Sequence, residues 1–357
     1  MISAAAQIEL NLPALRHNIC RVREFAPDSK LIAVIKANAY GHGLLRMADY
    51  LVGQVDAFAV ARVGEAIQLR KAQIASRILV FQGFSQFDEL EIFQGYQLEA
   101  VVHSEAQVVL LERANLSSPL KVWLKVDTGM NRLGIRPAQF DALLARLQQC
   151  QSVAENISFI THFANADDRQ DDKTTQQLQL FNKTVQNYKA EKSCANSAAI
   201  IAWPESHQDW VRPGLMLYGV SPMLGMSAQQ LGLLPVMSLY SRLIAIKQVY
   251  KGETVGYGGH WVADQDMCLG VVSAGYGDGY PRYAKAGTPV LIGQQRVPLV
   301  GRVSMDMLAV DLSACVDVQL GDQVTLWGED LPVEEIAACA HTIPYVLLCG
   351  ITRRVDV

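Results

Sequence analysis

Short apolar runs alternate with helical patterns along the first two thirds of the chain, and this alternation restricts the fold more than any other feature. Eight such runs lie at Leu31–Ile35, Ala57–Val60, Arg77–Phe81, Leu98–Val102, Lys121–Val126, Ser158–Thr161, Ser193–Cys194 and around Val211. Between them, apolar residues recur at helical spacing, beginning with a helix that Asn11 is placed to cap. Because neighbouring parallel strands need a long return connection, this rhythm predicts a parallel sheet.

Eight strand–helix units favour a TIM (β/α)8 barrel over an open doubly wound sheet. No GxGxxG or GxxxxGK[ST] segment follows an early strand, so a dinucleotide or P-loop site is not expected. We assign the barrel to residues 1–225, with the residues up to about Leu10 able to pair with the C-terminal domain. Residues 226–357 contain short β-type runs separated by Gly, Pro and Asp, with one helix at Val333–Ala340. They predict a separate, mostly β C-terminal domain.

Composition excludes several classes of partner. The net charge of −4, without a basic block, argues against nucleic acid. No apolar run approaches the ~18–20 residues that a membrane span requires, and Glu9 interrupts any signal-like segment. The seven cysteines form no CxxC pair and no zinc spacing, so we expect no metal site. These features indicate a cytoplasmic protein with a small-molecule substrate.

Lys36 ends the first buried run and opens the segment KANAYGHG. A lysine in this position is often a surface group whose apolar stem is buried. However, the carboxyl ends of buried parallel strands are where α/β enzymes place their chemistry. A partly desolvated lysine amine there can attack a carbonyl and form a Schiff base.

Polar groups also follow four other strands of the predicted barrel. They are Asp127–Arg132, then His162 and Asn165, then Asn196 and Ser197, and finally Arg212–Gly214. Each alone has an ordinary structural explanation, but together they predict a site at one mouth of the barrel. Backbone N–H groups at Ser197, Gly214 and Leu215 would suit a phosphate, because phosphate sites recur after the last two strands of this fold.

Nine ordered segments resemble the alanine racemases along essentially the whole chain. They are AVIKANAYGHG, KVDTGMNRLG, THFANAD, CANSA, RPGLMLYG, VGYGG, GYGDGY, GRVSMDM and IPYVLLCGI. The resemblance implies a barrel plus β domain, pyridoxal 5'-phosphate as cofactor and a homodimer with shared active sites. The implied reaction interconverts L-alanine and D-alanine, either to supply peptidoglycan synthesis or to serve alanine catabolism.

The resemblance also implies which residues form the site. Lys36 would carry the cofactor, and Tyr257 would reach the other face of the substrate Cα from the partner subunit. Two bases are needed because the proton leaves one face and returns on the other. The implied cofactor contacts are Lys36, Tyr40, His162, Asn196, Ser197, Arg212, Gly214, Leu215 and Tyr345. The implied substrate contacts are Arg132, Met305 and Tyr276, and Lys125 matches a position that is often carbamylated in relatives.

Two positions depart from the family pattern. Ser304 stands where many relatives have cysteine, and Val346 stands where we expect glutamate.

Three alternative functions use the same cofactor on a similar fold: a racemase of broader substrate range, a two-domain decarboxylase, and a non-catalytic cofactor carrier. The decarboxylases lack the VGYGG tyrosine, and the carriers have no second domain. The presence of both features here favours the alanine racemase.

Overall fold

The computed structural model describes residues 6–355, and these form two compact units. The barrel unit contains His17–Leu217 and Ser221–Gly232. The β unit contains Tyr218–Val220, the chain from Leu233 onward and the residues before His17.

The barrel unit is built on eight parallel strands that close into a ring, as predicted. The strands are β2 (Lys30–Val34), β3 (Ala57–Val60), β4 (Arg77–Val80), β5 (Glu99–Val102), β6 (Val122–Lys125), β7 (Ser158–Ile160), β8 (Lys192–Asn196) and β9 (Trp210–Arg212). The ring closes where Lys30 pairs with Trp210 and Leu31 with Val211. All four residues of β3 and of β5 are buried, because a parallel barrel is covered on both faces.

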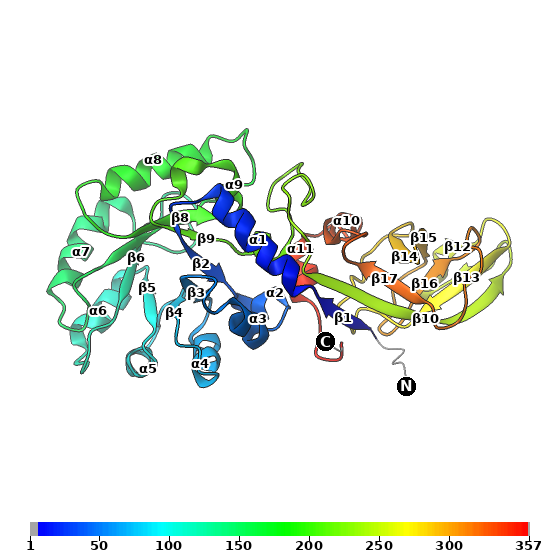
Figure 1. The fold of residues 1–357 in the computed structure, drawn as a ribbon, viewed down its shortest axis with the longest axis horizontal. Coiled ribbons are helices and arrows are strands. Elements are labelled where there is room, and N and C mark those ends of the chain that lie inside the picture. The colour runs from blue at the N-terminus through cyan, green and yellow to red at the C-terminus, as the bar shows by residue number, and fades with distance from the viewer. Residues whose placement is uncertain (1–5, 356–357) are drawn as a thin grey trace. The chain divides into compact units, whose positions relative to one another are not determined.

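Helices lie outside the ring of strands (Figure 1). They are α1 (Leu12–Phe25), α2 (Lys36–Tyr40), α3 (Leu44–Leu51), α4 (Val63–Lys71), α5 (Glu89–Gly95), α6 (Glu105–Arg113), α7 (Phe140–Gln149), α8 (Lys173–Val185) and α9 (Ser197–Ala202), with 3-10 turns η1 (Pro137–Gln139), η2 (Pro204–Ser206) and η3 (Leu215–Tyr218). Asn11 caps α1 as predicted, because its Oδ1 accepts the N–H of Ala14 at 3.0 Å. Among the described residues we find no helix whose length and apolarity would let it cross a bilayer.

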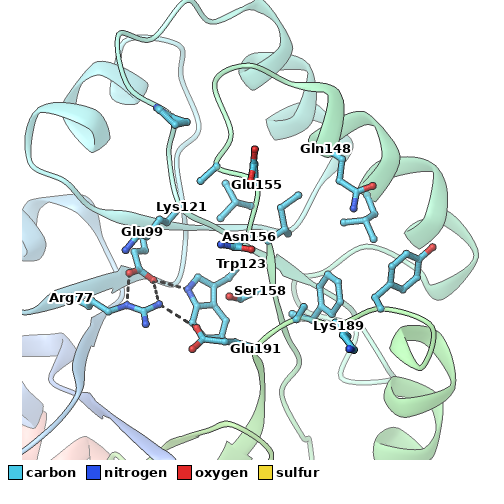
Figure 2. A pocket seen from close by; sticks show the side chains of 18 of the residues that line it. Arg77, Glu99, Lys121, Trp123, Gln148, Glu155, Asn156, Ser158, Lys189 and Glu191 are labelled. Atoms are coloured by element: carbon cyan, nitrogen blue, oxygen red, sulfur yellow. Dashed lines mark hydrogen bonds and ion pairs between the residues drawn. The ribbon is translucent and has the colours of Figure 1, made fainter.

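The amino-terminal ends of the barrel strands hold a paired charge cluster (Figure 2). The Arg77 guanidinium donates two hydrogen bonds to the Glu99 carboxylate, of 2.6 and 3.0 Å. The indole Nε1 of Trp123 donates to the same carboxylate at 2.8 Å, and Glu191 lies 3.6 Å from Arg77. A cavity of about 920 Å³ adjoins the cluster. Because its charged groups satisfy one another, we assign this end of the barrel to stability.

The β unit contains a seven-stranded sheet in the order β1-β10-β13-β16-β15-β14-β17, with a further pairing of β10 and β17. The strands are β1 (Gln7–Leu10), β10 (Met237–Val249), β13 (Met267–Val272), β14 (Pro289–Ile292), β15 (Gln295–Val300), β16 (Leu308–Asp311) and β17 (Gln323–Trp327), and a separate pair is formed by β11 (Thr254–Val255) and β12 (Trp261–Val262). The remaining elements are η4 (Tyr257–Gly259), α10 (Val333–Cys339) and α11 (Pro344–Cys349). The prediction of a mostly β second domain is confirmed.

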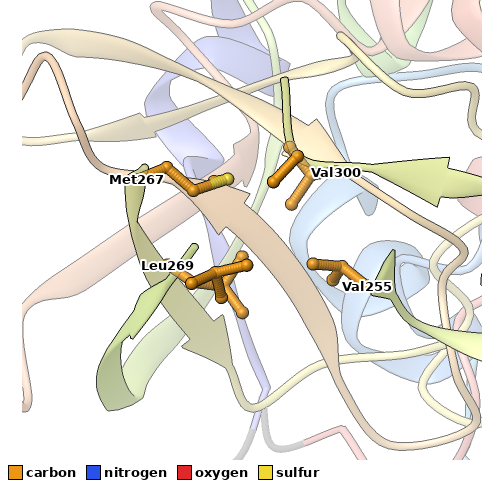
Figure 3. Packing of buried hydrophobic residues seen from close by; sticks show 6 residues of the cluster. Val255, Met267, Leu269 and Val300 are labelled. Atoms are coloured by element: carbon orange, nitrogen blue, oxygen red, sulfur yellow. The ribbon is translucent and has the colours of Figure 1, made fainter. Parts of the chain in front are cut away.

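A small apolar core packs in the β unit close to the η4 turn in sequence, and Figure 3 shows its side chains. It is formed by Val249, Val255, Ala263, Met267, Leu269 and Val300, with Trp261 and Ala309 packed against it. Val255 lies two residues before Tyr257, so burial of Val255 fixes the base of the turn that presents this tyrosine.

Candidate functional site

A left-handed turn follows Lys36 at the carboxyl end of β2. The next four residues, Ala37 to Tyr40, all have φ between 52° and 55°, although none is glycine. The turn is closed by i to i+4 hydrogen bonds, from Ala39 N to Ile35 O at 2.9 Å and from Gly41 N to Ala37 O at 3.2 Å. A left-handed helical conformation costs about 1–2 kcal/mol for each L-residue. A strained run of this length indicates a functional segment that its surroundings hold in place.

Tyr40, at the far end of this turn, meets the segment that follows β9. A β-carbon on Gly214 would lie 2.6 Å from Tyr40 Oη, so the tyrosine hydroxyl rests against the glycine backbone. Ser197 Oγ accepts the N–H of Gly214 at 2.8 Å and that of Met216 at 3.4 Å. A hydroxyl that accepts in this way still has its own proton to donate. Leu215 begins η3 beside this group.

Asn196 lies next to Ser197, and its side chain has a local structural role. Its Oδ1 accepts the N–H of Ala199 at 3.0 Å and so caps α9. The cap fixes where α9 begins and therefore where the Ser197 hydroxyl lies.

Arg212, at the end of β9, is only 4% exposed. Its guanidinium donates to Ser193 Oγ at 2.6 Å, to Thr161 O at 2.7 Å and to Cys194 O at 3.1 Å. These acceptors are neutral, so the positive charge is not cancelled by them. Burial lowers the pKa of Arg212 to about 10, which still leaves it protonated at neutral pH.

His162 follows β7, and its Nδ1 lies 3.4 Å from Arg212 Nη2. Burial, followed by the charge of Arg212 and of further cations, lowers the pKa of His162 well below its usual value. The imidazole is therefore neutral at pH 7, and a neutral ring nitrogen can accept from the guanidinium.

Lys125, the last residue of β6, joins the same group of cations. Burial lowers its pKa to about 8, and the charges of Arg212 and Arg132 act in the same direction while Asp127 opposes them. Lys36 also lies close enough to depress the pKa values of both Lys125 and His162. The carboxyl ends of β2, β6, β7 and β9 thus gather positive charge at one barrel mouth.

Arg132 lies in a loop whose ends are closed by backbone bonds from Asp127 N to Ile135 O and from Ile135 N to Lys125 O, both 2.9 Å. Asp127 Oδ1 accepts two N–H groups inside the loop, from Gly129 at 2.9 Å and Asn131 at 3.0 Å. These bonds hold the loop while Arg132 itself remains exposed.

The donor set at this mouth fits an anionic cofactor that carries a phosphate and reacts with an amine. It contains the Lys36 amine beside the strained turn and the hydroxyls of Tyr40 and Ser197. It also contains Gly214, whose lack of a side chain lets another group approach its backbone closely, and several cations. Such cations and N–H groups favour phosphate and carboxylate groups.

In the β unit, the segments VGYGG, GYGDGY and GRVSMDM pack backbone to backbone. A β-carbon on Gly301 would lie 2.7 Å from Val255 O. Tyr276 N donates to Ser304 O at 3.0 Å, and Gly277 N donates to Met305 O at 2.8 Å. A β-carbon on Gly275 would lie 2.3 Å from Ser304 O, so this approach requires glycine. The predicted side chains nevertheless point outward. Tyr257 is 71% exposed, Met305 52%, and Tyr276 and Tyr345 each 38%.

A groove of about 870 Å³ runs beside Tyr257, between β10 and the Gly301–Met307 segment. Exposed tyrosine and methionine at such a groove are typical of a surface that another molecule covers. Of the residues predicted to form the site, the structure places Lys36, Tyr40, Ser197, Arg212 and Gly214 at one barrel mouth, and their roles stay a prediction. Sequence reasoning missed Glu65, whose carboxylate accepts a backbone N–H of the turn that Lys36 opens.

Comparisons with known proteins agree along the whole chain. The sequence model of the alanine racemase N-terminal domain matches residues 10–222, and that of the C-terminal domain matches residues 236–357. An alanine racemase of Vibrio cholerae is 49% identical over 352 residues, covering 99% of this chain and 97% of the relative. A biosynthetic alanine racemase of Escherichia coli is also 49% identical, covering 98% of each chain. The crystal structure of biosynthetic alanine racemase from Pseudomonas aeruginosa is 44% identical, with a TM-score of 0.96 and 99% of each chain covered.

Proposed function

This chain belongs to the alanine racemase family, and from that premise we propose that it binds pyridoxal 5'-phosphate at Lys36 and interconverts L-alanine and D-alanine. Members of the family are isomerases that depend on this cofactor. The observation that carries the proposal is the convergence of the Lys36 amine, the buried Arg212 and the Tyr40–Ser197–Gly214 group at one barrel mouth. The alternative of a broader racemase is not favoured, because the full-length relatives are alanine racemases.

We assign the phosphate of the cofactor to Tyr40, Ser197, Gly214 and Leu215. Membership of the family adds Tyr345 to this proposed set. Asn196 supports the group by capping α9. Arg212 would contact the pyridine nitrogen, and His162 would accept from Arg212 on its other side.

When bound, pyridoxal phosphate supplies an electron sink for the charge that develops at the substrate Cα. Arg212 limits the strength of that sink, because its guanidinium keeps its proton at neutral pH and does not pass it to the ring. This restraint disfavours transamination as a side reaction.

Two residues invert the substrate Cα: one removes the α-proton from one face, and the other donates a proton to the opposite face. Lys36 takes the α-proton from D-alanine, and Tyr257 of the partner subunit takes it from L-alanine. Tyr257 is 71% exposed in one chain alone, which supports a role in the active site of a second chain. The proposal therefore includes a homodimer with shared sites.

The substrate carboxylate would be held by Arg132 and by the backbone of Met305, and Tyr276 would narrow the channel leading in. Lys125 would be carbamylated, because a lysine with a pKa of about 8 offers a neutral amine to CO2 under mild conditions. The amine adds to the carbon of CO2 and releases one proton, which leaves a carboxylate that can orient Arg132.

We further propose that the enzyme acts in the cytoplasm and supplies D-alanine for peptidoglycan, or serves alanine catabolism.

The test of cofactor binding and racemisation begins with a visible spectrum of the purified protein, followed by measurement of D-alanine formed from L-alanine on the same sample. Lys36→Ala should lose the absorbance of the bound cofactor and nearly all activity. Lys121→Ala, at the opposite barrel mouth, is the control and should keep both. A wild-type protein without the absorbance, or an active Lys36→Ala variant, would refute the proposal.

A further inference from the structure

Glu65 joins the strained turn after β2 to the turn after β3. Its Oε1 accepts the N–H of Ala37 at 2.6 Å. Its Oε2 accepts the N–H groups of Ala61 at 2.9 Å and Arg62 at 3.0 Å. The residue lies in the first turn of α4, where a carboxylate is favoured by the helix dipole.

The bond to Ala37 falls where the backbone pairing of β2 can no longer continue. Ile35 N still bonds to Ala59 O at 2.9 Å, which extends the β2–β3 pairing by one residue. Beyond it the chain turns left-handed, and the first N–H groups of any helical turn lack partners within the turn. Glu65 supplies an acceptor from another element to the first left-handed residue.

Other bonds hold the far end of the same turn. Asn38 Oδ1 accepts the N–H of Leu44 at 2.8 Å. The buried His42 ring lies with Nδ1 2.9 Å from Tyr40 O and 3.1 Å from Ala39 O. These partners come from within the segment, so they stabilise its shape without fixing it against the barrel. Glu65 ties it to β3 and α4.

We propose that Glu65 is a positioning residue for Lys36: by accepting the Ala37 N–H it holds the left-handed turn that aims the lysine amine. The inference rests on the proposed function, in which Lys36 carries the cofactor. Ala37 N belongs to the peptide plane that follows Lys36, so holding this N–H holds the Lys36 backbone and the direction in which its Cα–Cβ bond leaves it. Reactive groups must be held within about 0.5 Å and 10–20° to work well. Tyr40, at the other end of the turn, would shift together with Lys36.

The test compares Glu65→Gln with a matched control, Glu89→Gln. Glu89 lies in the first turn of α5 and accepts from Ser85 N at 2.6 Å and Gln86 N at 3.1 Å, but it does not bond to the Lys36 turn. A glutamine keeps the size of the side chain and offers only one oxygen. In Glu65→Gln it must therefore turn an amide N–H₂ toward either Ala37 or the Ala61–Arg62 pair.

The first readout is amide hydrogen exchange without cofactor. In the wild-type chain the Ala37 amide should exchange at least about tenfold more slowly than an unprotected amide. Glu65→Gln should weaken this protection at Ala37, while Glu89→Gln leaves it in place. An unprotected Ala37 amide in the wild-type chain would overturn the inference without any variant.

The second readout uses the loaded enzyme. Glu65→Gln should lower kcat by on the order of tenfold to a hundredfold with little change in KM for alanine, and it should slow the return of visible absorbance when cofactor is added to the apoprotein. Glu89→Gln should match wild type in all three. If the wild-type enzyme binds cofactor and racemises alanine while Glu65→Gln equals it, the positioning role is refuted and the function stands. If the wild-type enzyme binds no cofactor, the proposed function fails instead, and the exchange experiment still decides whether Glu65 holds the turn.

Discussion

The hydroxyl of Tyr40 lies against the backbone of Gly214, 2.6 Å from the point that a β-carbon on that glycine would occupy. This contact joins the turn after β2 to the segment after β9, two elements that are neighbours only because the barrel closes between those strands. Gly214 does not have a left-handed backbone, so crowding by Tyr40 rather than backbone strain would set the cost of a substitution.

Gly214→Ala should therefore destabilise the chain by about 1–3 kcal/mol and weaken cofactor binding. Replacing Tyr40 with Phe in the same chain removes the hydroxyl and should return part of the lost stability. Denaturant unfolding of the apoprotein measures both effects. Gly95→Ala, in α5, is the control, since a β-carbon there meets nothing within 4 Å. Equal losses from the two glycine variants would contradict the crowding argument.

Lys125 should make both carbamylation and stability depend on pH. Its pKa is lowered from 10.5 to about 8, so between these values the unfolded chain holds the extra proton and the folded chain does not. The penalty for burying Lys125 is therefore fully present below pH 8 and fades as the pH rises toward 10.5. As the pH rises through 8, the folded chain also holds more of Lys125 as the neutral amine that reacts with CO2.

Carbon-13 NMR with labelled CO2 should detect one carbamate for each chain, and Lys125→Ala should abolish the signal. Removal of CO2 should reduce activity, and its return should restore it. Lys173, in α8, provides the control substitution. A carbamate signal that persists in Lys125→Ala would place the modification elsewhere.

Shared sites predict complementation between inactive variants. Lys36→Ala and Tyr257→Phe each lack one of the two proposed bases. After subunit exchange about half of the dimers should be mixed, and each mixed dimer has one site with both residues intact, so activity should recover to about a quarter of the wild-type value. Lys36→Ala mixed with the double variant serves as the control and should stay inactive. Absence of recovery despite demonstrated exchange would count against shared sites.

Arg212 should determine how cleanly the reaction stays a racemisation. A glutamate at position 212 can share a proton with the pyridine nitrogen, whereas the arginine keeps its own. Arg212→Glu should lower racemase activity by about tenfold or more and raise the share of alanine converted to pyruvate. Arg212→Gln, which also loses the bonds to Ser193 and Thr161 but has no acidic group that can transfer a proton, is the control. Equal pyruvate formation by the two variants would refute the argument.

Much of the fold was predictable because apolar periodicity sets it. The run Ala57–Val60 matches β3 residue for residue, since a buried strand bounded by turn residues has clear ends. The ends of β8 were harder to predict. The predicted run at Ser193–Cys194 is short and partly polar. The strand itself covers Lys192–Asn196, because it pairs with its neighbours over that length.

The left-handed turn could not be predicted from local sequence. Ala37 and Ala39 favour right-handed helix, and the glycines that usually signal positive φ come only at Gly41 and Gly43. The first residue of the turn with positive φ, Ala37, donates its N–H to Glu65, which lies on another element. A glutamate in the first turn of the helix after β3 is an ordinary capping signal, so nothing in the sequence pointed from it to Lys36.

The pairing of β1 with β10 has a consequence for synthesis on the ribosome. Gln7 pairs with Tyr240, and the whole barrel lies between them in the chain. The first strand therefore emerges early and must wait, unpaired, until its partner has been translated. A chain released before β10 is complete would leave β1 without its partner, and an unpaired strand edge is prone to aggregate. Interrupted translation should thus leave this protein with an unpaired strand even when all the residues of the barrel strands have been made.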